Sequence, residues 1–300
     1  MQYYIIWGFL HIAAWLPLPL LHGIGHVAGN LLNAIPNRLR AITTQHIRQC
    51  LPELTGAQQR RLVRASLIET VKTLTETGVL WLRPGPRALH LIRTVDGREL
   101  VDAALKKGRG VILATPHLGS WEAAGLYGAA SFHMTCLYRP LRLAKLERRV
   151  RNARARLGAN YVTTSAAGIR TMYRTLEEGG TAALLPDQEP RPGSGIFAPF
   201  FGIPAWSGVL LARMARRTGA PDIFAWCERL PRGRGYHLHF RAAPQDIDDA
   251  DLEVAAGAMN RAVEQLVREC PQQYQWGYRR FKRRPAGEAP FYPNRQQGSE

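Results

Sequence analysis

Val111-Ile-Leu-Ala-Thr-Pro-His-Leu-Gly-Ser-Trp-Glu122 is the stretch from which both the fold and the chemistry of this chain can be read. Its first four residues are apolar and predict a short buried strand, which Thr115-Pro116 ends. His117 follows directly, and Glu122 stands in the first turn of the next predicted helix. Open α/β sheets place their active sites at such strand ends.

The chemistry of this stretch depends on the pair His117 and Glu122. The carboxylate could accept a hydrogen bond from one ring nitrogen and fix the tautomer, so that the other nitrogen takes a proton from a hydroxyl. Backbone N–H groups near Gly119 and Ser120 are candidates to bind an oxyanion. The alternative is a histidine that caps a turn and a glutamate on a solvated helix face.

The rest of the chain alternates between short apolar runs and helical patterns. The sequence predicts strands at 135–138, 161–163, 181–185, 223–226 and 237–240, and helices at 141–157, 169–178, 206–218 and 252–269. Two further helices lie between 41 and 83, with Thr55 as the cap of the second. We therefore expect one α/β domain whose mixed sheet is flanked by helices.

The charge of the chain favours an anionic partner. Forty Lys and Arg against 23 Asp and Glu give a formal net charge of +17. Phospholipid, a phosphorylated glycolipid, an acidic carrier protein and nucleic acid all fit, as does a generic solubilising surface. The four cysteines form no CxxC pair, so they indicate neither a zinc site nor a disulfide framework.

The amino-terminal 37 residues contain no Lys, Arg, Asp or Glu. The run from Tyr3 to Leu21 is almost wholly apolar, and a transmembrane helix needs about 20 such residues. Arg38 and Arg40 follow, which would leave the body of the protein in the cytoplasm. We expect a membrane anchor over 1–37. A helical hairpin in one leaflet and a buried core helix are the alternatives.

A second motif, Leu185-Pro-Asp187-Gln-Glu189, also ends a predicted strand. Asp187 or Glu189 could support His117 or orient a substrate. An apolar loop with Phe200, Phe201 and Gly202 follows, and it could line the entrance for an acyl chain. Alternatively, this loop packs on the core.

A third motif closes the folded part: Pro271-Gln-Gln-Tyr274-Gln-Trp276-Gly-Tyr-Arg-Arg280-Phe-Lys-Arg-Arg-Pro285. Aromatic and basic residues interleave in it, which suits a bilayer headgroup region. Single-stranded nucleic acid could stack on the same composition, but no nucleic-acid-binding motif accompanies it. We therefore expect no nucleic-acid partner.

Together the three motifs resemble those of the lipid A biosynthesis lauroyl/myristoyl acyltransferases, within the lysophospholipid acyltransferase-like superfamily. The resemblance covers nearly the whole length, from Cys50-Leu-Pro-Glu-Leu54 to Pro285. It implies a glycerolipid acyltransferase-like fold and an enzyme on the cytoplasmic face of the cell inner membrane. It also implies acyl transfer from acyl carrier protein to a hydroxyl of a lipid A precursor, with no metal and no cofactor besides the thioester co-substrate.

The resemblance assigns site residues by position. His117 and Glu122 would be the catalytic pair, and Asp187 lies in the strand-end acidic cluster. Arg154 matches a basic position near the active site, within a predicted basic helix that could dock an acidic carrier. Arg139 belongs to a Tyr-Arg-Pro segment that related transferases acting on other lipids share.

The expected organisation is an anchor over 1–37, a catalytic domain over 38–285 and a flexible tail over 286–300. Two other functions stay open. The same chemistry could act on a lysophospholipid, a mannosylated phosphatidylinositol or a lipoamino acid. A membrane-tethered binding protein would instead use the basic surface without turnover.

Overall fold

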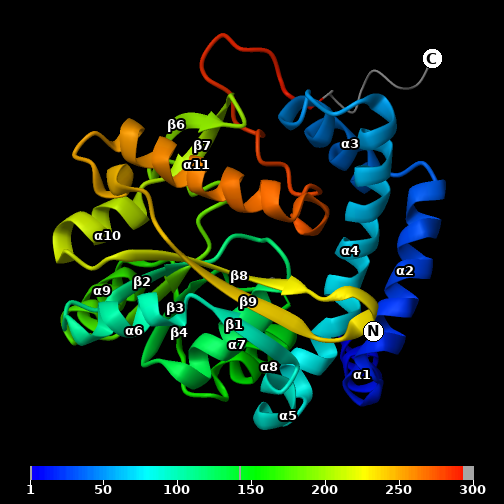
Figure 1. Cartoon of the computed structure of the whole chain (residues 1–300), viewed down its shortest axis with the longest axis horizontal. Helices are drawn as coiled ribbons and strands as arrows, with labels where there is room; N and C mark the ends of the chain where they lie inside the picture. Colours follow the sequence, from blue (N-terminus) through cyan, green and yellow to red (C-terminus); the bar gives the residue numbers. More distant parts are fainter. Residues whose placement is uncertain (1, 142, 293–300) are drawn as a thin grey trace.

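The core of the protein is a seven-stranded mixed sheet (Figure 1). The computed structural model describes residues 2–141 and 143–292. The sheet order is β1-β9-β8-β2-β5-β3-β4, and every neighbouring pair is parallel except β8 and β9. The strands are β1 (Ile92–Asp96), β2 (Val111–Ala114), β3 (Met134–Tyr138), β4 (Asn160–Thr163), β5 (Thr181–Leu184), β8 (Asp222–Arg229) and β9 (Tyr236–Ala242). The predicted α/β class is confirmed.

Helices cover both faces of this sheet, which is why its central strand is apolar throughout. All four residues of β2 are buried. Ile112 and Ala114 face one core, together with α9 (Ala166–Glu177), α10 (Leu210–Thr218) and α11 (Leu252–Glu269). Val111 and Leu113 face the other core, with α6 (Arg98–Lys106) and α7 (Trp121–Ser131). The basic helix α8 (Ala144–Ala155) also packs beside β4.

In the described part of the chain, five helices precede the first strand: α1 (Gln2–Trp15), α2 (Leu18–Ala34), α3 (Arg38–Cys50), the 27-residue α4 (Gly56–Leu82) and the short α5 (Gly85–Leu89). Thr55 and Gln58 form a capping box at the start of α4, so the predicted cap is confirmed. In Figure 1, α2 runs alongside α4. Gly29 permits this approach, since a Cβ there would lie 2.4 Å from the Cα of Ile68.

The apolar run expected to anchor the chain does not form one continuous helix. Among the described residues, no helix is long and apolar enough to cross a membrane. The apolar run is divided because α1 ends at Trp15 and Pro17 occupies the N-cap of α2 in an extended conformation.

Among the strands, two features are not predicted from the sequence. The first is β1, a half-exposed edge strand. The second is the hairpin of β6 (Gly195–Phe200) and β7 (Ile203–Gly208), whose second strand occupies the first residues of the helix predicted from 206. Of the expected flexible tail, residues 293–300 lie outside the described part. Tyr292 is buried, and its hydroxyl lies 2.5 Å from Nε2 of His46.

Candidate active site

His117 and Asp187 meet at one edge of the sheet because the strands that precede them are neighbours. β2 and β5 pair in parallel with Ala114 opposite Leu184, and each residue lies three positions beyond its strand. Nδ1 of His117 lies 2.9 Å from one oxygen of Asp187, and the backbone N–H of His117 donates to the other at 3.0 Å. From the sequence, either Asp187 or Glu189 could support His117. In the structure, Asp187 is the one that contacts it.

The surroundings of the imidazole favour one tautomer. Burial alone would raise the pKa of Asp187, but the contacts with His117 lower it, so the carboxylate stays charged and accepts the Nδ1 proton. The side-chain amide of Gln188 lies 3.1 Å from Nε2 of His117 and also donates to Gln275 at 3.0 Å. Nε2 is then the basic nitrogen of the ring. Neither glutamine was predicted, although both stand inside motifs that the sequence analysis singled out.

Glu122 does not make the predicted hydrogen bond to His117. Its carboxylate instead forms a two-point ion pair with Arg154, whose Nε donates at 3.0 Å, and accepts from Nε1 of Trp81 at 2.8 Å. Burial raises the pKa of Glu122, but the charge and hydrogen bond of Arg154, the hydrogen bond of Trp81 and the charge of His117 together outweigh it, and the net shift is downward. The reason for this correction is that Glu122 points toward α4 and α8, whereas Asp187 already occupies Nδ1.

The backbone of Gly119 and Ser120 is also used differently from the prediction. The N–H of Gly119 donates to Gln273 at 3.0 Å and that of Ser120 to Cys227 at 2.7 Å. Gly119 has φ +61°, and a Cβ there would lie 2.1 Å from the Cys227 carbonyl oxygen. These N–H groups therefore fix the loop against β8 and are not free to bind an oxyanion.

A buried ion pair also contacts the loop that contains Gly119 and Ser120. Glu76 of α4 accepts from Ser120 Oγ at 2.7 Å and pairs with Arg229 at 2.9 Å, and Arg229 also donates to the Gly119 carbonyl. His22 of α2 and Tyr236 of β9 complete the shell around the Glu76 carboxylate. Burial raises the pKa of Glu76, yet Arg229 and His22 bring it down to about 2. Sequence patterns gave no signal for this long-range network.

The third motif packs on the His117 loop. The N–H of Gln275 donates to the His117 carbonyl at 3.0 Å, and Tyr274 forms a β-bridge with Leu118. Trp276 is 1% exposed and its indole N–H donates to the Pro271 carbonyl at 2.7 Å. The headgroup-facing role expected for these aromatic residues is therefore corrected: they are core.

The remaining predicted site residues lie apart from the imidazole. Phe200 and Phe201 are buried in the core beside Tyr274 and Trp276, so only the alternative of a packed loop fits them, and Gly202 is exposed at the hairpin turn. Glu189 accepts from the backbone of Arg283. Arg139 is exposed just beyond β3.

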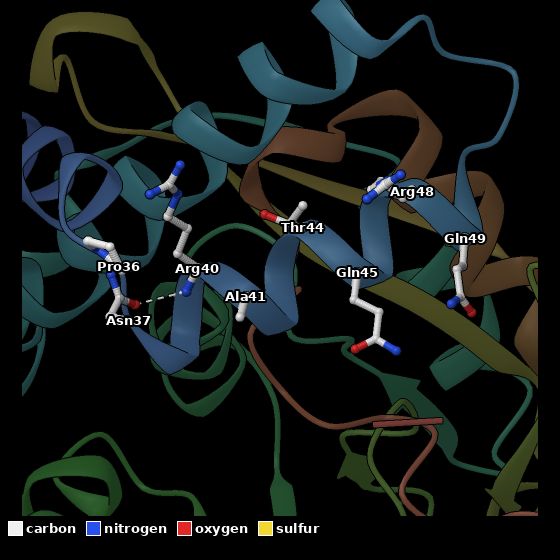
Figure 2. Close-up of a pocket in the computed structure, with 8 residues that line it drawn as sticks. All are labelled: Pro36, Asn37, Arg40, Ala41, Thr44, Gln45, Arg48 and Gln49. Carbon is white, nitrogen blue, oxygen red and sulfur yellow. Dashed lines mark hydrogen bonds between the residues drawn. The ribbon is translucent and has the colours of Figure 1, made fainter. Parts of the chain in front are cut away.

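One small pocket adjoins Glu122, and a larger hollow lies elsewhere, on α3. A pocket of about 10 Å³, on the order of one water molecule, lies among Trp81, Glu122, Arg154 and Tyr161. A hollow of about 660 Å³ follows one face of α3, where Figure 2 shows Arg40 and Arg48 along the same helix. The first hollow adjoins the ion pair of Glu122 and Arg154, and the second is a separate basic surface.

A histidine held by a buried aspartate at the end of a central strand is an arrangement that can take a proton from a hydroxyl group. Within the described residues, the contacts of the His117 ring are with Asp187, Gln188 and Trp121. The chain belongs to the bacterial lipid A biosynthesis acyltransferase family, which it matches over residues 1–283. It is therefore an acyltransferase.

The chain is similar to three named relatives. It is 28% identical to the lipid A biosynthesis lauroyltransferase of Escherichia coli K12, over 95% of this chain and 94% of the relative. It is 26% identical to the palmitoleoyltransferase of the same organism, over 97% and 95%. A phosphatidylinositol mannoside acyltransferase of Mycobacterium tuberculosis is 30% identical over 51% of this chain and 49% of its own.

Proposed function

We propose that this protein transfers a fatty acyl group from the thioester of acyl carrier protein to a hydroxyl of a lipid A precursor. The observation that carries the proposal is His117, held through Nδ1 by buried Asp187 and with Nε2 basic, in a chain that matches this family along its length.

In the proposed mechanism, Nε2 of His117 takes the proton of the acceptor hydroxyl as its oxygen attacks the thioester carbonyl. Asp187 keeps the Nδ1 proton in place and stabilises the imidazolium that forms. When the tetrahedral intermediate collapses, the C–S bond breaks and the imidazolium returns the proton to the departing thiolate. No acyl-enzyme intermediate is needed, so both substrates bind together.

Glu122 and Arg154 have a supporting role in this proposal. Their two-point ion pair is mostly buried, a geometry that holds both side chains rigidly. Arg154 also lies over the Trp81 ring at 5.3 Å. The pair therefore fixes the position of α8 relative to α7.

The basic surface supports an acidic donor. Helix α8 packs against α7, the helix that carries Glu122. Its exposed basic side chains are Lys145, Arg148, Arg149 and Arg151. Carrier proteins of this kind present acidic surfaces, and complementary charge raises their association rate. Arg40 and Arg48 on α3 would suit the anionic headgroup of the acceptor or of a surrounding lipid.

Membrane attachment fits the outer face of α1 and α2. Most of the exposed large apolar side chains of the described residues lie there, including Ile5, Ile12, Trp15, Val27 and Leu31. An exposed apolar surface of this size, followed by arginines, suits a helical hairpin lying in one leaflet. We infer that the protein binds the cytoplasmic face of the inner membrane in this way.

The test uses membranes that contain wild-type protein or Asp187→Asn, supplied with labelled acyl carrier protein thioesters and tetra-acylated lipid A precursor. Transfer by the wild type alone supports the donor, the acceptor and the histidine–aspartate base. Consumption of the thioester without a lipid A product would overturn the acceptor. Phosphatidylinositol mannoside is then the acceptor to try next, because of the mycobacterial relative.

A further inference from the structure

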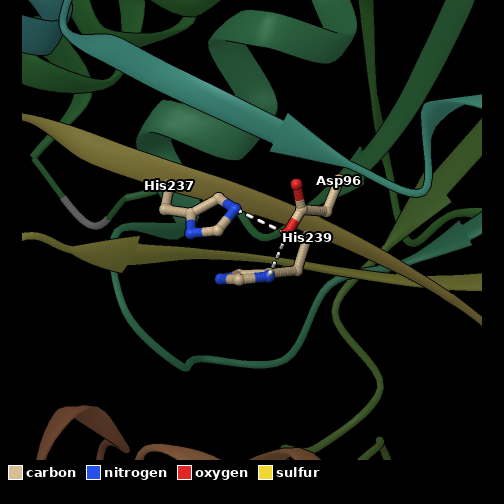
Figure 3. Close-up of side chains that lie close together, drawn as sticks. All are labelled: Asp96, His237 and His239. Carbon is tan, nitrogen blue, oxygen red and sulfur yellow. Dashed lines mark hydrogen bonds and ion pairs between the residues drawn. The ribbon is translucent and has the colours of Figure 1, made fainter.

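Three metal-ligating side chains converge at the β1 edge of the sheet (Figure 3). Asp96 is the last residue of β1, and His237 and His239 lie two positions apart on β9, hence on the same face. Asp96 stands opposite His239 in the parallel register of the two strands. One ligand atom from each side chain lies within 4.8 Å of the other two.

Two ring nitrogens face one carboxylate oxygen. Nε2 of His237 lies 2.8 Å from Oδ2 of Asp96, and Nδ1 of His239 lies 3.8 Å from the same oxygen. The first distance fits a hydrogen bond, but the second is too long for one. The centres of the two imidazole rings are only 3.8 Å apart.

His239 is a buried polar group without a hydrogen-bond partner among the described residues. It is 8% exposed, and neither ring nitrogen finds a donor or acceptor at bonding distance. Such a group costs about 1–3 kcal/mol if nothing else satisfies it, so its presence calls for an explanation.

The second nitrogen of His239 faces a carboxylate. Nε2 lies 3.6 Å from Oε2 of Glu228 on the neighbouring strand β8. Histidine ligands of metal ions usually donate their other N–H to such a carboxylate, which fixes the tautomer. The Trp226 ring stacks on His239 at 4.4 Å and restrains its plane. Nδ1 is thereby left to point toward Asp96 and His237.

We propose that Asp96, His237 and His239 form a binding site for a divalent transition-metal ion of the zinc type. The ligands are Oδ2 of Asp96, Nε2 of His237 and Nδ1 of His239, with a water molecule as the fourth. Two imidazoles and one carboxylate suit zinc, which binds nitrogen and oxygen ligands at about 2.0–2.2 Å. Asp96 and Glu228 offset the nearby positive charge of Arg241, which lies over Trp226.

The ion would tie the edge strand β1 to β9. Among the described residues, β1 pairs only with β9, and its register slips between Ile92 and Thr94. A shared ion at Asp96 would therefore stabilise this edge strand. This role is independent of acyl transfer and departs from the sequence-based expectation of no metal.

The experiment uses the full chain, purified without a histidine tag and stripped with a chelator. It is titrated with Zn²⁺ by calorimetry and with Co²⁺ by visible absorption. We expect one saturable equivalent, and at least a tenfold weaker affinity in Asp96→Asn and in His237→Gln. The exposed His90→Gln serves as the matched control and should bind like the wild type.

Two outcomes would overturn the proposal: the absence of a saturable equivalent, or equal binding by the wild type and an Asp96→Asn/His237→Gln double variant. Both positions are partly exposed, so circular dichroism of the metal-free proteins should show that the variants fold. As a second readout, Zn²⁺ should raise the Tm of the wild type and leave that of the double variant unchanged.

Discussion

The tautomer of His117 depends on a single carboxylate. In Asp187→Asn the side-chain amide can donate to Nδ1, which moves the ring proton to Nε2 and removes the base. We expect acyl transfer to slow by about two to four orders of magnitude, the usual contribution of general-base catalysis. Initial rates with a labelled thioester and lipid acceptor measure the loss.

Glu189→Gln is the matched control for that substitution. Its carboxylate accepts from the Arg283 backbone and does not contact His117. Its rate should stay close to that of the wild type. If Asp187→Asn kept wild-type turnover, or Glu189→Gln lost as much, the assignment of Asp187 to the imidazole would fail.

Glu76 should dominate the acid sensitivity of folding. Its pKa in the folded protein is about 2, below the ordinary value of 4.5. Its contribution is therefore complete above pH 4.5 and is lost as the pH falls toward 2. Glu76→Gln leaves Arg229 buried without its counterion, which costs about 3–5 kcal/mol at pH 7.

Urea unfolding of the wild type and Glu76→Gln at pH 7 and at pH 3 tests this. The difference between the two proteins should shrink at pH 3, because the wild-type carboxylate is already losing its advantage there. An equal difference at both pH values would show that the charge of Glu76 does not stabilise the fold.

At the scale of elements, α1 and α2 should carry membrane binding. Ile5, Ile12 and Val27 are each more than 60% exposed, so serine at these positions removes apolar surface without opening a cavity. We expect the triple serine variant to release most of the protein from anionic vesicles in a flotation assay, while its Tm stays within a few degrees of the wild type.

Val254→Ser on α11 is the control, since this residue is exposed on an unrelated helix. Retention of the triple variant on vesicles would point to the basic surface as the main attachment.

At the scale of the whole molecule, chain segments far apart in sequence meet at the catalytic loop. Nδ1 of His46 lies 2.6 Å from the Trp276 carbonyl, and the next residue toward the amino terminus, Gln275, donates to the His117 carbonyl. Trp276 also contacts the rings of Phe201 and Tyr274. The amino-terminal helices and the third motif therefore support the histidine together.

Trp276→Ala should accordingly affect both folding and catalysis. A fully buried tryptophan costs about 3–5 kcal/mol when truncated to alanine. We also expect the folded fraction to transfer acyl groups more slowly, because the loop that carries His117 would lose packing contacts with this segment. Urea unfolding and turnover per folded molecule separate the two effects. A destabilised variant with an unchanged rate would mean that the loop needs no support from this segment.

The sequence by itself determined the α/β class, most strands and helices, the helix cap at Thr55 and the motifs that contain His117, Glu122, Asp187 and Arg154. These features depend on local periodicity, caps and residue types, which neighbouring positions along the chain reveal. At the amino terminus, the long apolar run favoured a membrane anchor and left its form open. The structure divides this run into two helices at Pro17.

Only the tertiary structure decided which carboxylate reaches which base. Asp187 meets His117 because β2 and β5 are adjacent and in register, and Glu122 turns to Arg154 because α7 and α8 pack together. Glu76, Gln188, Gln275 and the cluster around His239 acquire their contacts in the same way. Their partners lie tens to more than a hundred residues away, and strand order and helix packing bring them together, which no local pattern encodes.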